Sequence, residues 1–140
     1  MANAFASIDI ALPANQVWQL IGGFGSLPDW LPYIPKSELS EGGRIRHLAN
    51  PEGEAIVERL VMFDDAARTY SYAILQAPFP VVDYLSTLKV IDNGDESCRV
   101  EWSGRFTPVG VSDDEASALF QGIYADGLMA LVGELKKAKE

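Results

Sequence analysis

The C-terminal part of the chain restricts the fold most. From residue 112 onward, apolar residues recur at spacings of three and four, which is typical of an amphipathic α-helix. Ser112 and Glu115 match a capping box at its start, and the lysines near its end complement the helix dipole. We therefore expect a helix from about Asp113 to Lys137, in which about 26 residues would span roughly 39 Å. A helix of this length needs a large apolar surface to lie against.

The sequence before this helix predicts an antiparallel sheet, which would provide the apolar surface. Stretches with strand character alternate with short turn signals, and Asn93-Gly94 is the strongest of these because Asn-Gly favours two-residue hairpins. Short turns between successive strands imply antiparallel pairing. The expected strands are Ala4–Leu12, Pro35–Ser40, Arg44–Leu48, Glu54–Phe63, Thr69–Gln76, Val81–Ile91 and Ser97–Thr107.

Two short helical segments are expected after the first strand. Pro13–Phe24 has the apolar spacing of a helix, with a proline suited to its first turn and a glycine pair at its end. Ser26–Pro35 contains three prolines, which favours one helical turn followed by an extended segment. No repeat or linker interrupts the chain, so we expect one domain over residues 1–140. The predicted class is α+β, with a seven-stranded antiparallel sheet wrapped around a long C-terminal helix.

Composition excludes several kinds of site. The net charge of −9 disfavours binding to nucleic acid or anionic lipid. One cysteine and one histidine, His47, exclude an internal disulfide and a two-histidine zinc site. The sequence has no phosphate loop, nucleophile elbow or dinucleotide fingerprint, so no cofactor is expected. No long apolar run and no signal-peptide start occur, so we expect a cytoplasmic protein without membrane insertion.

A sheet wrapped around a helix leaves a space in which small molecules bind. Strand alternation places tyrosines and tryptophan on the face toward the helix. These aromatic residues either fill the core or line a cavity, and their polar tips, which need partners when buried, favour the cavity. The expected lining is Trp30, Tyr33, Tyr72, Tyr84, Trp102, Phe106, Tyr124 and Leu128.

Short motifs follow one another in a specific order. They are Val17-Trp18, Gly25-Ser26-Leu27-Pro28-Asp29-Trp30, Glu58-Arg59-Leu60, Asp64-Asp65, Arg68-Thr69-Tyr70-Ser71-Tyr72 and Val100-Glu101-Trp102-Ser103-Gly104-Arg105-Phe106. With the terminal helix, they resemble the START-related polyketide cyclase/dehydrase and lipid transport family over essentially the whole chain. The resemblance implies the helix-grip fold, also found in birch-pollen allergens and plant abscisic-acid receptors.

Comparison with those receptors suggests particular site residues. Glu58, Tyr84 and Ser86 resemble residues that face the ligand, and Lys36 resembles a cavity lysine that pairs with a ligand carboxylate. The segments at residues 50–53 and 76–80 lack the gating patterns of the receptors, so hormone reception is not implied. With the strand faces included, the expected ligand-binding residues are Trp30, Tyr33, Lys36, Arg46, Glu58, Leu60, Tyr72, Tyr84, Ser86, Trp102, Phe106, Ile123, Tyr124 and Leu128.

Glu58 is the candidate acid or base. Its strand is apolar on both faces, so periodicity alone leaves open whether Glu58 or Arg59 points inward, and the resemblance favours Glu58. A carboxyl group in an apolar cavity has a raised pKa, which suits proton transfer. The alternative is a structural ion pair with Arg46 on the neighbouring strand. Arg46 and Lys36 either bind an anionic group of the ligand or are solvated charges on their strands.

Three functions remain open. The favoured one is binding of a small, largely apolar or aromatic ligand, because the sequence offers one acid and no second catalytic group of certain placement. The second is a cyclase/dehydratase-type enzyme that acts on a polyketide-like substrate with Glu58 as acid or base. The third is an interaction module whose cavity is only a core. The expected partner is a small hydrophobic ligand, and a homodimer also remains open.

Overall fold

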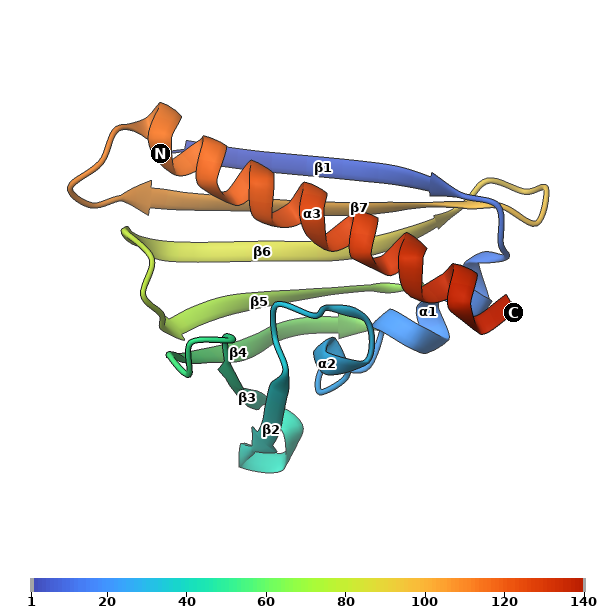
Figure 1. Ribbon diagram of the computed structural model, residues 1–140, viewed down its shortest axis with the longest axis horizontal. Helices are drawn as coiled ribbons and strands as arrows, with labels where there is room; N and C mark the ends of the chain where they lie inside the picture. Colours follow the sequence, from blue (N-terminus) through green and yellow to red (C-terminus); the bar gives the residue numbers. More distant parts are fainter. Residues whose placement is uncertain (1, 140) are drawn as a thin grey trace.

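The computed structural model describes residues 2–139, and these form one antiparallel sheet with a long helix across one face (Figure 1). The strand order is β1-β7-β6-β5-β4-β3-β2. The predicted fold class is confirmed, and the element ends differ from the expected ones by at most about two or three residues. The elements are β1 (Ala2–Ile10), α1 (Ala14–Ile21), α2 (Leu27–Trp30), β2 (Lys36–Ser40), a 3₁₀ turn (Glu41–Gly43), β3 (Ile45–Ala49), β4 (Ala55–Asp64), β5 (Thr69–Gln76), β6 (Val81–Asp92), β7 (Cys98–Pro108) and α3 (Asp113–Lys139).

The hairpin between β6 and β7 turns at Asn93-Gly94 as predicted, but its loop is longer than two residues, because Asp92 pairs with Cys98 and residues 93–97 form the loop. Gly94 adopts a φ of 87°, a region that glycine enters without steric cost. Its amide donates to Asp92 Oδ1 at 2.8 Å, and the Asn93 amide donates to the Ser97 carbonyl at 3.0 Å. Alternate residues of β7 are buried, from Cys98 to Phe106, as the period of a strand requires.

The long helix α3 begins with the expected cap. The Glu115 amide donates to Ser112 Oγ at 3.1 Å, while the Ser112 hydroxyl donates to Glu115 Oε1 at 3.2 Å. The glutamate thus bonds the serine hydroxyl rather than the serine amide. The buried hydrophobic residues of the helix recur at spacings of three and four, and they are Ala116, Phe120, Tyr124, Leu128, Leu131 and Leu135.

By length and mean hydropathy (1.2), residues Asp113–Lys137 would also suffice to cross a membrane. In the structure, however, these residues pack against the sheet. The helix lies along β1 and β7 and crosses the sheet obliquely (Figure 1), with its apolar residues against the strands. It is therefore the core helix of the fold.

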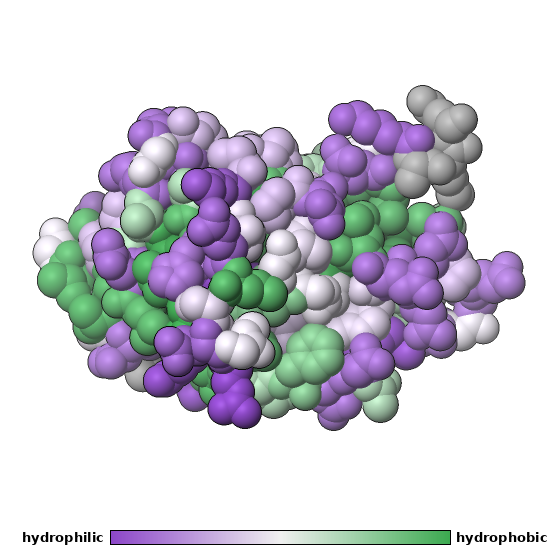
Figure 2. All heavy atoms as spheres, turned by 90° about the horizontal axis from the view of Figure 1, so that it is seen from below, coloured by the Kyte–Doolittle hydropathy of each residue, from purple (hydrophilic) through white to green (hydrophobic). Residues whose placement is uncertain are grey.

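Irregularities in the strands shape the face that the helix covers. Between β4 and β5, Glu58 pairs with Ile74 while Val57 pairs with Gln76, so one residue of β5 bulges. A second register shift lies between Leu60 and Met62. Such bulges re-aim side chains. After the second one, Val61, Met62 and Phe63 are all exposed, and hydrophobic residues also interrupt the hydrophilic surface seen from the β2 side (Figure 2).

Gly127 on α3 lies against the sheet and the loop after α2. A Cβ atom there would lie 2.6 Å from Trp102 Cζ3 and 3.2 Å from Leu31 Cδ1. The glycine therefore permits close packing of the helix on Trp102 rather than leaving room for a ligand. Gly122, by contrast, faces open space.

Candidate functional site

A cavity of about 390 Å³ lies between the covered face of the sheet and three segments. These segments are α3, the chain that joins α2 to β2, and the turn that joins β3 to β4. Apolar side chains form most of its wall, and polar groups enter it at a few points. The lining residues are Leu27, Leu31, Tyr33, Ile34, Arg46, Leu48, Asn50, Pro51, Glu52, Ile56, Glu58, Tyr72, Ile74, Phe79, Tyr84, Trp102, Phe120, Ile123, Tyr124 and Asp126.

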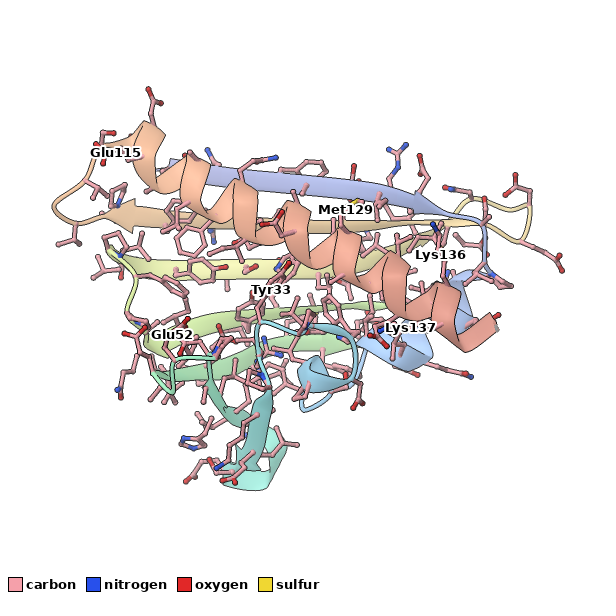
Figure 3. The ribbon with its side chains drawn as sticks, in the orientation of Figure 1. Tyr33, Glu52, Glu115, Met129, Lys136 and Lys137 are labelled. Carbon is pink, nitrogen blue, oxygen red and sulfur yellow. The ribbon has the colours of Figure 1, made fainter. Side chains whose placement is uncertain are left out.

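The exposed members of this lining mark the mouth of the cavity. Tyr33, Pro51, Glu52 and Asp126 are exposed although they line it. Tyr33 lies on the segment before β2 and Glu52 on the turn after β3, on the side of the sheet where α3 lies (Figure 3). A ligand can therefore reach the interior between α3 and these two loops.

Arg46 and Glu58 form an ion pair inside the cavity. The two residues are directly opposite in the β3–β4 ladder. Arg46 Nε lies 2.8 Å and Nη2 2.7 Å from Glu58 Oε1, and the side chains are 1% and 8% exposed. Glu58 therefore faces inward, whereas Arg59 is exposed. Glu58 is thus paired with Arg46 and also lines the cavity.

The Arg46 guanidinium is enclosed by aromatic rings. Its Cζ lies 4.2 Å from the ring centre of Phe24, 4.6 Å from that of Tyr72 and 5.7 Å from that of Tyr70. Nη1 also donates to the Phe24 carbonyl at 3.1 Å and to the Tyr70 hydroxyl at 3.3 Å. Ring faces attract cations, so the rings and these acceptors stabilise the Arg46 charge without solvent.

Burial changes the proton affinity of both partners. Burial raises the pKa of Glu58, and the neighbouring Arg46 charge opposes that rise. Burial by itself lowers the pKa of Arg46, but the Glu58 carboxylate and the two tyrosines outweigh it and raise that pKa. Arg46 therefore remains a cation throughout the ordinary pH range.

One oxygen of Glu58 has no hydrogen-bond donor among the described residues. Both contacts from Arg46 end on Oε1, and no group among residues 2–139 is found to donate to Oε2. Because the residue lines the cavity, Oε2 can accept a hydrogen bond from a ligand or exchange a proton with it.

A second polar group is a cluster of hydroxyls on the cavity floor. Tyr84 and Tyr124 share a short hydrogen bond, and Tyr72 Oη lies 3.5 Å from Tyr84 Oη. Trp102 Nε1 donates to Tyr72 Oη at 3.2 Å and to Ser86 Oγ at 3.1 Å. The sheet and α3 both contribute to this cluster, so it ties the helix to the strands while its tyrosines face the cavity.

Burial makes these tyrosines poor acids. Burial raises the pKa of Tyr124 to about 12. The pKa values of Tyr72 and Tyr84 also rise, first through burial and then through nearby negative charge, from Glu58 at Tyr72 and from ionised Tyr72 at Tyr84. At neutral pH all three are therefore neutral hydroxyls, which can donate hydrogen bonds but cannot serve as bases.

Most of the expected lining is found in place. Eight of the fourteen expected ligand-binding residues line the cavity in the described part of the chain: Tyr33, Arg46, Glu58, Tyr72, Tyr84, Trp102, Ile123 and Tyr124.

Five expected residues lie near the cavity without being part of its lining. Trp30, Phe106 and Leu128 are buried in the core around it, and Trp30 packs on Trp102 with ring centres 5.9 Å apart. The Ser86 hydroxyl donates a hydrogen bond to the Ser103 carbonyl at 2.7 Å. Leu60 is half-buried and lies just before a bulge.

Lys36 does not reach the cavity. Its side chain is 67% exposed on β2 and lies 3.7 Å from Glu38 on the same strand. The expectation of an anion-binding lysine is therefore corrected: at this position β2 turns the side chain toward solvent. His47 is also exposed and shares a 2.8 Å hydrogen bond with Ser40 Oγ.

Sequence reasoning missed the residues of the mouth. Asn50, Pro51 and Glu52 belong to a turn, and Asp126 is an exposed residue of the helix, so neither strand alternation nor burial marks them. The apolar residues Leu31, Ile34 and Phe79 come from loops, where periodicity has no meaning. Among the described residues, no group of three or more His, Cys, Asp or Glu side chains is placed to hold a metal ion.

Known proteins share this architecture. An uncharacterised protein from Bacillus thuringiensis is 59% identical over 94% of this chain and 97% of its own, with a TM-score of 0.92. The protein XoxI from Bacillus cereus is 57% identical over 100% of this chain and 99% of its own, with a TM-score of 0.95. The Zhui aromatase/cyclase from a Streptomyces species is 19% identical over 98% of this chain and 93% of its own, with a TM-score of 0.76, and shows the fold alone. A search of curated proteins gave no match.

The family described as polyketide cyclase/dehydrase and lipid transport matches residues 1–136. The match spans the sheet, the loops around the cavity and nearly all of α3. It agrees with the motifs along the sequence and with the helix-on-sheet architecture, and the chain therefore belongs to the polyketide cyclase/dehydrase and lipid transport family.

Proposed function

We propose that the protein binds a small, largely apolar or aromatic ligand in the cavity between the sheet and α3. The cavity itself carries this proposal. Its volume of about 390 Å³ falls in the range of small-molecule sites, and its wall is apolar except for a few polar groups. Tyr72, Tyr84 and Trp102 provide flat surfaces against which an aromatic ring can lie.

The polar groups would orient the ligand within this space. Glu58 Oε2 offers a hydrogen-bond acceptor at one place, and the tyrosine hydroxyls offer donors at another. A ligand with an apolar body and one or two hydroxyl or carbonyl groups fits this arrangement, because each buried polar group would find a partner.

A second candidate is acid–base catalysis of the cyclase/dehydratase type. The open Oε2 of Glu58 favours it, since burial raises the pKa of this carboxyl group toward values useful for proton transfer. The Zhui protein is called an aromatase/cyclase. Binding remains the preferred function because the tyrosines near Glu58 stay protonated at neutral pH and therefore cannot act as a second, basic group.

Two measurements test the binding function. Native mass spectrometry of freshly purified protein should show a small molecule retained by the folded chain. Tryptophan fluorescence, to which Trp102 in the wall contributes, should report saturable binding of naphthylethanol, a neutral aromatic alcohol. Absence of both signals would contradict the proposal.

A matched pair of variants on α3 makes the test specific. Ile123→Trp places a large ring in the cavity and should abolish naphthylethanol binding. Met129→Trp introduces the same ring at a position of the same helix that is 64% exposed (Figure 3), and should leave binding intact. Equal effects of the two variants would show that the probe binds elsewhere.

A further inference from the structure

The charges around the cavity are unevenly distributed. Its lining contains three carboxyl groups, those of Glu52, Glu58 and Asp126, and among the described residues Arg46 is its one basic side chain. Glu52 and Asp126 are exposed at the mouth, on a turn of the sheet and on the helix respectively. A ligand that enters at this mouth therefore meets two exposed carboxylates.

Arg46 is not available to bind an anion. Its side chain is 1% exposed, and Glu58, the Phe24 carbonyl and the Tyr70 hydroxyl already accept its hydrogen bonds. The rings of Phe24 and Tyr72 cover its faces. A ligand carboxylate would have to displace Glu58, or lose its hydration without gaining a free cation, and both are unfavourable.

Among the described residues, no other basic side chain belongs to the cavity lining. Lys36 lies opposite Ala49, next to the turn that carries Glu52, but its exposed side chain lies beside Glu38 and is not part of the lining. Lys136 and Lys137 lie near the C-terminal end of α3, far along the molecule from Glu52 (Figure 3). Glu52 and Asp126 are thus the exposed charged residues of the lining, and they act over the short distance that salt leaves unscreened.

Resting on the binding function proposed above, we propose that the cavity selects ligands whose polar end is a hydrogen-bond donor, neutral or positively charged, and rejects hydrophobic carboxylates. A hydroxyl or ammonium group can donate to Glu58 Oε2, and a positive charge is attracted by the two carboxylates at the mouth. Fatty acids and aromatic acids meet repulsion at the mouth and no free cation inside.

Three probes with the same ring test this selectivity: naphthylethylamine, naphthylethanol and naphthylacetate. At neutral pH and low salt, the ammonium probe should bind about tenfold or more tightly than the carboxylate probe, with the alcohol between them. Added salt should reduce the difference between the two ions while changing the affinity for the alcohol little.

A double variant locates the source of the difference. Glu52→Gln with Asp126→Asn should reduce the ratio of the two ionic affinities to about threefold or less. The control, Glu41→Gln with Glu96→Gln, removes the same charge from exposed turn residues outside the cavity lining and should leave the ratio near its original value.

The outcomes separate this inference from the function on which it rests. Equal or tighter binding of the carboxylate probe would overturn the selectivity while leaving ligand binding standing. An equal effect of the control variant would also overturn it, because the charge would then act from the whole surface. Failure of all three probes to bind the folded protein would overturn the binding function, and the selectivity with it.

Discussion

The hydroxyl of Tyr124 on α3 occupies the place where a side chain at Gly104 on β7 would begin. A Cβ atom at residue 104 would overlap the tyrosine oxygen. Gly104 thus lets the helix bring its tyrosine against the sheet, where it bonds to Tyr84. The floor of the cavity depends on a missing side chain as much as on the aromatic residues.

Gly104→Ala should therefore destabilise the protein. The added methyl group must move Tyr124 or the strand, and overpacking of this kind costs about 1–3 kcal/mol in free energy of unfolding. Chemical denaturation measures the loss. In the Tyr124→Phe background, where the hydroxyl is absent, the same substitution should cost less, and equal costs in the two backgrounds would show that the two residues do not interact.

Two glycines of α3 should respond in opposite directions to alanine. Gly127→Ala places a Cβ 2.6 Å from the Trp102 ring and should lower the free energy of unfolding by about 1–3 kcal/mol. Gly122→Ala meets open space and should raise it by about 0.5–1 kcal/mol, because glycine weakens a helix. Thermal unfolding of both variants provides the comparison, and stabilisation by Gly127→Ala would indicate a looser helix–sheet contact.

Loss of the Glu58 charge should mainly affect stability. Glu58→Gln leaves the Arg46 cation buried without its counter-ion, so the free energy of unfolding should fall by about 3–5 kcal/mol. Affinity for naphthylethanol should change by about tenfold or less, since the amide retains an acceptor oxygen. Urea denaturation and fluorescence titration measure the two effects.

Two further variants test whether the loss of charge causes the instability of Glu58→Gln. Arg59→Gln, on the exposed face of the same strand, should change stability by about 0.5 kcal/mol or less. Arg46→Met combined with Glu58→Leu removes both charges and should be more stable than Glu58→Gln. A double variant as unstable as the single one would show that shape, rather than charge, determines the loss.

The sequence predicts the elements of this fold well because their signals are local. The Ser112–Glu115 cap, the Asn93-Gly94 turn and the alternation of β7 depend on neighbouring residues, and all appear in the structure. Antiparallel order follows from the short turns. These local signals agree with one another, which is why the fold could be predicted without any knowledge of distant contacts.

The wall of the cavity is harder to predict because it depends on distant contacts. A bulge on β5 opposite Glu58 and a second one on β4 after Leu60 interrupt the regular pairing of these strands, so alternation could not place their residues. Lys36 fits the receptor pattern in sequence, yet it points to solvent. Glu52 and Asp126 line the same cavity although one lies on a turn and the other on the helix, and no local pattern reports that arrangement.

The buried tyrosines predict how stability depends on alkaline pH. Their pKa values are raised in the folded protein, to about 12 for Tyr124 and also upward for Tyr72 and Tyr84, against about 10 when unfolded. Above about pH 10 the unfolded chain loses these protons while the folded chain keeps them, so the unfolded state binds fewer protons and stability falls as pH rises.

The size of this effect can be measured. Below about pH 10 the three tyrosines contribute no pH dependence, and between about pH 10 and 12 each should contribute up to about 1.4 kcal/mol per pH unit to the loss. Denaturation at a series of pH values gives this slope, and tyrosinate absorbance should show the three groups ionising only as the protein unfolds. Tyr124→Phe should remove one of the three contributions. Ionisation of all three near pH 10 in the folded protein would instead mean that water reaches the floor of the cavity, because a hydrated hydroxyl keeps its ordinary pKa.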